Sequence, residues 1–275
     1  MSDIDQNSEY FDMNKTLWNA RTAVHLKSDF YDNDTFMNGR NTLSEPEMNN
    51  LGDVSGKSII HLQCHFGQDS LSLARMGAHV TGIDISDAAI TKAQEMNEQL
   101  NLTASFICCN VMDTLAHVRD TFDIVFVTYG ATCWLPDLKP WAHTVSELLK
   151  PGGFLYYCEF HPTFYMIDDT KKRIGFPYFN TGVQVESNDS SYTDGDTVLG
   201  LKEYFWNHSL SEIISPLLSE GLSLESIMEY DYSPYNCFEN MVEVQKGRYA
   251  LDINGVRPPH LLEFKARKKG IDYIK

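Results

Sequence analysis

The chain has 275 residues and a formal net charge of −16, with 38 acidic against 22 basic side chains. Hydrophobic residues make up 43% and charged residues 22% of it, an ordinary globular composition that excludes an intrinsically disordered protein. The negative charge repels polyphosphates and anionic membrane surfaces at long range, so we expect neither nucleic acid nor a membrane as a partner.

Residues 1–10 are polar and acidic and lack a secretory pattern, and no run of about eighteen apolar residues occurs in the chain. The six cysteines form neither a disulfide framework nor a CxxC metal pattern. We therefore expect a cytoplasmic protein with no metal site, whose oligomeric state the sequence leaves open.

The first fifty residues carry many aromatic side chains and no strand-like alternation, which predicts an N-terminal helical cap over 1–50 that covers a sheet. After Lys57, short apolar runs alternate with amphipathic stretches, the pattern of parallel strands joined by crossover helices. The first five expected strands are Ser58–Leu62, His79–Asp84, Ala104–Cys109, Phe122–Tyr129 and Phe154–Glu159.

The expected helices are Gln68–Met76, a stretch that begins after the cap Ser86, and Leu138–Leu149. The segment Lys150–Gly153 (KPGG) is expected to end the third helix and to turn into the fifth strand, because proline cannot continue a helix and glycine permits the turn.

Residues 161–206 are polar, aromatic and rich in turn formers, which predicts a hairpin or cap inserted after the fifth strand. A capping box at Ser209 begins a further helix, and Leu222–Tyr230 and Leu261–Lys265 are the last two expected strands. The sequence thus predicts the cap followed by one domain, 51–275, that contains this insertion.

Loops that follow parallel strands meet at one edge of a sheet, where ligands bind at the point of strand-order reversal. Asp84 ends the second strand, 17 positions after Gly67, and a carboxylate at this place can accept both ribose hydroxyls of an adenosine. Ser86 already supplies a cap for the next helix, which favours a ligand role for Asp84. A nicotinamide dinucleotide suits the carboxylate equally well.

The loop after the first strand, residues 63–67 (QCHFG), separates these alternatives. Dinucleotide-binding loops use GxGxxG so that the backbone approaches a pyrophosphate closely, whereas this loop has one glycine. The loop therefore favours an adenosine ligand without a pyrophosphate, such as S-adenosylmethionine.

Five segments in order carry a family resemblance. They are Lys57–Gly67 (KSIIHLQCHFG), Val80–Ser86 (VTGIDIS), Asn110–Asp113 (NVMD), Phe122–Asp137 (FDIVFVTYGATCWLPD) and Leu149–Phe154 (LKPGGF). Together they resemble the class I S-adenosylmethionine-dependent methyltransferases, particularly a bacterial small-molecule branch. The resemblance implies an α/β, Rossmann-like doubly wound sheet of seven strands in the order 3-2-1-4-5-7-6, the last strand antiparallel, with S-adenosylmethionine as cofactor and S-adenosylhomocysteine as product.

The resemblance also implies which residues hold the donor. Beside its methionine part lie Gln63, Cys64, His65 and Gly67; its ribose meets Asp84; its adenine meets Ile85, Asn110, Val111 and Met112; its methyl group lies over Thr128 and Tyr129. The sequence departs from the family's first motif, which has an acid in place of His61 and glycines in place of Gln63 and His65.

Methyl transfer is an in-line displacement at a sulfonium, which requires alignment and exclusion of water and needs a base only when the acceptor must lose a proton. Glu159, His161 and Tyr129 are the candidate bases. The acceptor pocket is expected to include Tyr31, Tyr129, Trp134 and His161. Two alternatives stay open, a structural role for His161, which the sequence favours, and a core position for Trp134.

The sequence therefore predicts a methyltransferase that acts on a small-molecule acceptor. Two alternatives stay open, a non-catalytic S-adenosylmethionine-binding or regulatory protein and a nicotinamide-dependent oxidoreductase. The sequence identifies neither the acceptor nor the methylated atom.

Overall fold

The computed structural model describes residues 3–168, 170, 172–188, 191–193 and 199–270. Within those ranges, none of the helices combines the length and the apolar character that crossing a bilayer requires.

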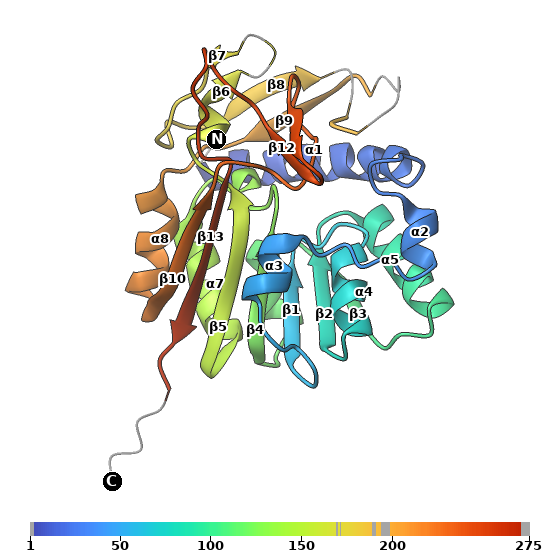
Figure 1. Cartoon of the computed structure of the whole chain (residues 1–275). Coiled ribbons are helices and arrows are strands. Elements are labelled where there is room, and N and C mark those ends of the chain that lie inside the picture. Colours follow the sequence, from blue (N-terminus) through green and yellow to red (C-terminus); the bar gives the residue numbers. More distant parts are fainter. Residues whose placement is uncertain (1–2, 169, 171, 189–190, 194–198, 271–275) are drawn as a thin grey trace.

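A seven-stranded mixed sheet forms the centre of the molecule (Figure 1). Its strands are β1 (Ser58–Leu62), β2 (His79–Asp84), β3 (Ser105–Cys108), β4 (Phe122–Thr128), β5 (Leu149–Phe160), β10 (Leu222–Tyr230) and β13 (Leu261–Lys268). Their spatial order is β10-β13-β5-β4-β1-β2-β3, and β13 runs antiparallel to both of its neighbours. Counted along the chain this is 3-2-1-4-5-7-6 with an antiparallel last strand, so the expected fold class is confirmed.

The largest error in a predicted strand boundary concerns β5, whereas the ends of β3, β4 and β13 that differ from the prediction do so by one to three residues. β5 begins at Leu149, which pairs with Phe122 before the register shifts, so the KPGG segment lies within the strand rather than ahead of it. A Cβ added at Gly153 would lie 2.9 Å from the carbonyl oxygen of Asp123, so glycine lets the two backbones pass closely here.

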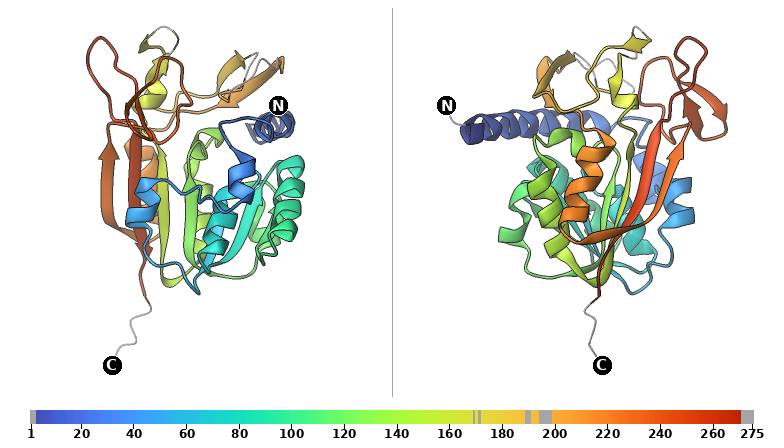
Figure 2. Two further views of the ribbon diagram at one scale, coloured as in Figure 1. Left: turned by 45° about the vertical axis from the view of Figure 1, so that its right-hand side comes forward. Right: turned by 90° about the vertical axis from the view of Figure 1, so that its left-hand side faces the viewer.

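Helices cover both faces of the sheet (Figure 2). One core cluster joins the sheet to α6 (Thr114–His117), α7 (Leu138–Leu148) and α8 (Leu210–Ser219), and further clusters on the other side involve α4 (Gln68–Arg75) and α5 (Asp87–Gln99). Ile59 and Ile60 are fully buried in different clusters, as a strand covered on both faces requires.

Segments outside the sheet lie above the edge at which the parallel strands end (Figures 1 and 2). The long helix α1 (Asp3–His25) crosses this edge, and the hairpin β8 (Gln184–Asn188) and β9 (Leu201–Phe205) packs on it. Asn14 of α1 donates to the carbonyl oxygen of Tyr204 at 2.7 Å and accepts from its N–H at 3.1 Å. The shorter elements are α2 (Asn33–Met37), α3 (Glu45–Asn50), β6 (Ile167–Asp168), β7 (Arg173–Ile174), β11 (Val242–Gln245), β12 (Arg248–Ala250) and three 3-10 turns, Val111–Asp113, Thr132–Trp134 and Phe164–Met166.

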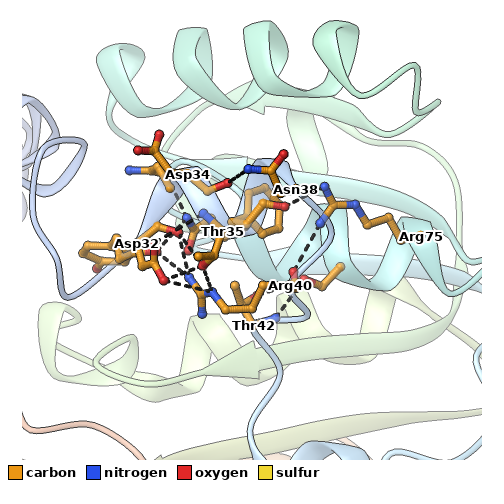
Figure 3. Close-up of polar contacts among 12 residues, drawn as sticks. Asp32, Asp34, Thr35, Asn38, Arg40, Thr42 and Arg75 are labelled. Atoms are coloured by element: carbon orange, nitrogen blue, oxygen red, sulfur yellow. Dashed lines mark hydrogen bonds and ion pairs between the residues drawn. The ribbon is translucent and has the colours of Figure 1, made fainter.

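Polar contacts fasten the α2 segment to α4 (Figure 3). The guanidinium of Arg75 donates to the carbonyl oxygens of Phe36 at 2.8 Å and Arg40 at 3.2 Å. Arg40 in turn donates to the carbonyl oxygen of Tyr31 at 2.6 Å, and Asp32 caps α2. These contacts hold Tyr31 next to the loop that follows β1.

Candidate functional site

Two cavities, of about 880 and about 110 Å³, adjoin at the carboxyl ends of the parallel strands. They share eight lining residues: Trp18, Tyr31, Gln63, His65, Tyr129, Gly130, Trp134 and Tyr192. Of the other residues predicted for the site, Cys64, Gly67 and Thr128 line the larger cavity, and Asp84, Ile85, Asn110 and Val111 line the smaller one. The fold thus brings most of the predicted site together.

Asp84 lies at the end of β2, in the wall of the smaller cavity, and is 9% exposed. Its carboxylate accepts the backbone N–H of His65 and that of Ser86, both at 2.8 Å. Burial raises the pKa of Asp84 to about 6, although both of these hydrogen bonds act to lower it. The side chain joins the loop after β1 to the start of α5, where the hydroxyl of Ser86 accepts from the N–H of Ala89 at 3.1 Å.

The loop after β1 keeps a left-handed backbone at two residues that are not glycine. The φ angle is +58° at Gln63 and +51° at His65, the two positions at which the resembling family has glycine. Left-handed conformation costs an ordinary residue about 1–2 kcal/mol, so the loop holds its shape against strain. Gly67 has φ +80°, and a Cβ there would lie 2.7 Å from the ring of Phe106.

The same two side chains carry buried polar atoms that find no partner among the described residues. The amide nitrogen of Gln63 donates to the carbonyl oxygen of Ala131 at 2.8 Å, but its Oε1 has no hydrogen bond. His65 Nε2 lies 2.9 Å from His25 Nδ1, whereas His65 Nδ1 has no hydrogen bond. Unsatisfied buried polar atoms are rare and costly, so the pair fits a ligand with hydrogen-bonding groups, such as the amino-acid part of S-adenosylmethionine.

One face of α1 supplies site residues that the sequence analysis missed. Arg21 forms a buried ion pair with Glu203 of β9 at 2.8 Å, and the Trp18 ring lies 5.3 Å from that of Trp134. His25 lies 2.6 Å from Ser191 Oγ, and burial lowers the pKa of His25 to about 3. Trp18, Arg21 and His25 are spaced three and four residues apart, a helical-face signal that was available in the sequence.

Glu159 does not line either cavity. Its buried carboxylate accepts four backbone N–H groups, from Gly130, from Ala131 at 2.5 Å, from Thr132 at 3.2 Å and from Phe160 at 2.8 Å. These bonds fix the loop after β4. Both oxygens are occupied in this way, which favours a structural role for Glu159 over the predicted role of a base.

His161 and Met112 also lie outside both linings. His161 is 2% exposed, with Nε2 at 2.8 Å from a Glu229 carboxylate oxygen and Nδ1 at 2.7 Å from Thr163 Oγ1. Met112 packs beside the core cluster of α7. These contacts favour the alternative of a structural His161 over a base or pocket residue, and the adenine contact of Met112 stays a prediction.

The remaining acceptor-pocket candidates border both cavities. The Trp134 indole N–H donates to the carbonyl oxygen of Gly130 at 2.6 Å, and the Tyr31 and Tyr192 hydroxyl oxygens lie 2.5 Å apart. Tyr129, just past β4, has the left-handed φ of +32°. Such a backbone is unusual for an aromatic residue and is found at sites that need a fixed side chain.

Comparisons with known proteins agree with this geometry. Residues 59–153, from β1 into β5, match the sequence model of a methyltransferase domain. The ubiquinone biosynthesis O-methyltransferase of Coxiella burnetii is 30% identical over 116 residues, which are 40% of this chain and 47% of that protein. Phosphoethanolamine N-methyltransferase 1 of Triticum aestivum is 27% identical over 127 residues, 45% of this chain and 25% of that protein. The chain thus spans about half the length, or less, of these curated relatives.

Among solved structures, an S-adenosylmethionine-dependent methyltransferase from Listeria monocytogenes superposes with a TM-score of 0.61 at 20% identity, covering 82% of this chain and 95% of that one. This likeness concerns the fold. Residues 59–153 thus match a methyltransferase domain, and the described chain has the fold and the strand order of S-adenosylmethionine-dependent methyltransferases.

Proposed function

We propose that this protein transfers a methyl group from S-adenosylmethionine to a small-molecule acceptor. The observation that carries the proposal is the position of Asp84, whose buried carboxylate ends β2 and lines the smaller cavity together with Ile85, Asn110 and Val111. A carboxylate at this place suits the two ribose hydroxyls of the donor.

The donor supplies a methyl group on a cationic sulfur, and the protein binds, orients and shields it. We assign the adenosine to the smaller cavity and the amino-acid part to Gln63 and His65, whose unpartnered atoms would be satisfied there. Phe11, Asn14 and Trp18 of α1 line the smaller cavity, which supports the proposal that this helix, within the predicted cap 1–50, is a cover that excludes water.

The larger cavity is proposed to hold the acceptor. Its 880 Å³ lies in the range of about 300–1,000 Å³ that is usual for small-molecule pockets. Aromatic rings from both ends of the chain line it, including Phe30, Phe160, Tyr235 and Phe238. We propose a cytoplasmic location, because Cys64, Cys108, Cys109, Cys133 and Cys158 are all thiols.

Calorimetry with S-adenosylmethionine and S-adenosylhomocysteine tests the donor site. Replacing Asp84 by Ala removes charge-assisted hydrogen bonds and should weaken binding by about 1.5–3 kcal/mol, or about 10- to 150-fold. Asp113→Ala is the matched control, since Asp113 is exposed nearby and makes no cap bond. Equal affinity of the Asp84→Ala variant and the wild type would show that the ribose lies elsewhere.

A non-catalytic donor-binding protein is the second candidate, favoured by the departures at Gln63 and His65 from the family's loop. It would bind S-adenosylhomocysteine, yet would release none of it from S-adenosylmethionine with any acceptor tested. Binding of NAD without binding of S-adenosylmethionine would instead favour an oxidoreductase.

A further inference from the structure

A chain of hydroxyl groups leads from the junction of the two cavities to a buried carboxylate. The hydroxyl oxygen of Tyr129 lies 2.8 Å from Ser44 Oγ, and Ser44 donates to a carboxylate oxygen of Glu47 in α3. Glu47 is 1% exposed and forms no ion pair within the described part of the chain. Burying a carboxylate without a cation costs free energy. A functional role for Glu47 would explain why the fold accepts this cost.

The direction of the hydrogen bonds is fixed by counting protons. Ser44 has one hydroxyl hydrogen, which it gives to Glu47 when that carboxylate is ionised. Tyr129 must then donate to Ser44. The thiol of Cys158 donates to the Tyr129 oxygen at 3.5 Å, which leaves a second lone pair on that oxygen for another donor.

Of the three hydrogen-bonded residues Tyr129, Ser44 and Glu47, Tyr129 is the one that reaches the proposed reaction site. It lines both cavities, follows β4 directly, and keeps its position at a strained φ of +32°. Glu47 and Ser44 line neither cavity. They can therefore act on a ligand only through Tyr129.

The groups around Glu47 favour a carboxylate that exchanges protons near neutral pH. Burial is the main cause that raises its pKa to about 7, the charge of Asp69 acts in the same direction, and the hydrogen bond from Ser44 acts to lower it. The other titratable neighbours are Tyr156, Cys158 and Tyr235, whose own pKa values burial raises, so they stay neutral.

We propose that Tyr129, Ser44 and Glu47 form a proton relay that accepts the proton of a hydroxyl or amine acceptor during methyl transfer. As the acceptor atom forms its bond to the methyl carbon and the sulfur keeps the electrons of the broken bond, the acceptor's proton passes to Tyr129. The Tyr129 proton passes to Ser44, and the Ser44 proton to Glu47, which ends as a neutral acid. Charge balances, because the positive sulfonium and the negative carboxylate are both lost.

This inference rests on the proposed function and narrows its substrate class. A neutral O–H or N–H acceptor needs such a relay, whereas a carboxylate or a thiolate has no proton to lose. Tyr129 is the group that touches the acceptor, and Ser44 and Glu47 position and receive the proton.

The first test needs neither donor nor acceptor. Infrared difference spectra across about pH 5 to 9 follow the carbonyl stretch of protonated carboxylic acids. One buried carboxyl should titrate near 7 in the wild type and be missing in Glu47→Gln. Ser44→Ala should move its midpoint upward, since it removes the hydrogen bond to the ionised form, and Ser44→Thr should restore it. Tyr129→Phe should also move the midpoint upward, since it removes the hydroxyl that donates to Ser44 and so strengthens that bond. Glu45→Gln is the control, because Glu45 lies on the same helix but pairs at the surface with Arg248.

The second test is the pH profile of turnover with catechol and primary-amine acceptors. Turnover should rise through the Glu47 midpoint in the wild type, and Glu47→Gln should lose this rise and about 100-fold in rate. Ser44→Thr should recover turnover where Ser44→Ala does not. A Glu47 midpoint indifferent to Tyr129→Phe, or an unchanged pH profile in Glu47→Gln, would overturn the relay. Calorimetry with S-adenosylhomocysteine distinguishes the two kinds of failure. If only the relay is wrong, the wild type still binds S-adenosylhomocysteine; if the proposed function is wrong, it does not.

Discussion

At the scale of single residues, the site depends on side chains held in costly states. Asp84 is a carboxylate buried beside backbone N–H groups, and Gln63, His65 and Tyr129 have left-handed backbones. Each of these states costs free energy, which packing elsewhere in the protein must offset. Strained residues of this kind are concentrated at sites where a fixed geometry is needed to bind a ligand.

Donor affinity should depend on pH through Asp84. Only the ionised carboxylate accepts both ribose hydroxyls, and the pKa of Asp84 is raised to about 6, so affinity should fall as the pH drops through this value. One unit below it, about nine-tenths of the carboxyls are protonated and binding weakens about tenfold. The pKa values of His25 and His65 are lowered by burial, which keeps both neutral in this range. Calorimetry at several pH values measures the effect, and an equal dependence in Asp84→Asn would contradict the assignment.

The strain at Gln63 can be separated from its contacts by comparing two substitutions. Gln63→Ala and Gln63→Gly both remove the bond to Ala131, but only glycine relieves the φ of +58°. The glycine variant should therefore be more stable than the alanine variant by about 1 kcal/mol in denaturant unfolding. Both should bind donor more weakly than the wild type. If alanine proves as stable as glycine, the loop is not strained at this position.

At the scale of elements, the site is built by segments that lie far apart in the sequence. The parallel strands supply a rigid edge, while α1, the α2 segment and the β8–β9 hairpin close it from above (Figures 1 and 2). Loops and short helices depend on a few polar fastenings, so these elements should be the easiest to loosen.

Arg75 provides polar contacts of this kind between α4 and the α2 segment. Replacing it by Ala removes two charge-assisted bonds to the α2 segment and its contact with the Phe36 ring, whose centroid lies 4.4 Å away. A loss of about 1.5–3 kcal/mol should speed amide exchange over residues 31–42 by about 10- to 150-fold, with little change in the strands. Hydrogen exchange with mass spectrometry measures this. Lys92→Ala is the control, because Lys92 pairs with its helix neighbour Glu95 at the surface, away from the α2 segment. An unchanged rate of amide exchange over residues 31–42 would show that apolar packing, and not Arg75, stabilises the segment.

At the scale of the whole molecule, net charge bears on the choice of partner. A chain of charge −16 should show no affinity for a labelled DNA duplex or a transfer RNA in fluorescence anisotropy at low salt, where electrostatic attraction is strongest. Binding that weakens steeply as salt is added would reveal a basic surface and would contradict a small-molecule acceptor.

The strand order of the sheet was implied by the family resemblance, whereas the alternation of strands and helices, the α/β class and the position of Asp84 could be predicted from the residues themselves. These properties follow from local signals, since apolar periodicity, caps such as Ser86 and strand ends act over a few residues. The bounds of β1, β2 and β10 agree with the sequence to the residue. The start of β5 does not, because its pairing with Phe122, far along the chain, overrode a turn signal.

The surroundings of the cavities could not be predicted from the sequence, because they depend on contacts between distant segments. Glu159 and His161 are candidate bases in the sequence. In the structure, the Glu159 carboxylate accepts N–H groups of a loop, and the His161 ring nitrogens contact Glu229 and Thr163. Trp18 and Glu47 carry no motif, yet folding brings the first to the donor loop and the second to Tyr129 through Ser44. Periodicity shows which face of an element is buried, but the partner that buries it is set by packing between distant segments, which no local pattern encodes.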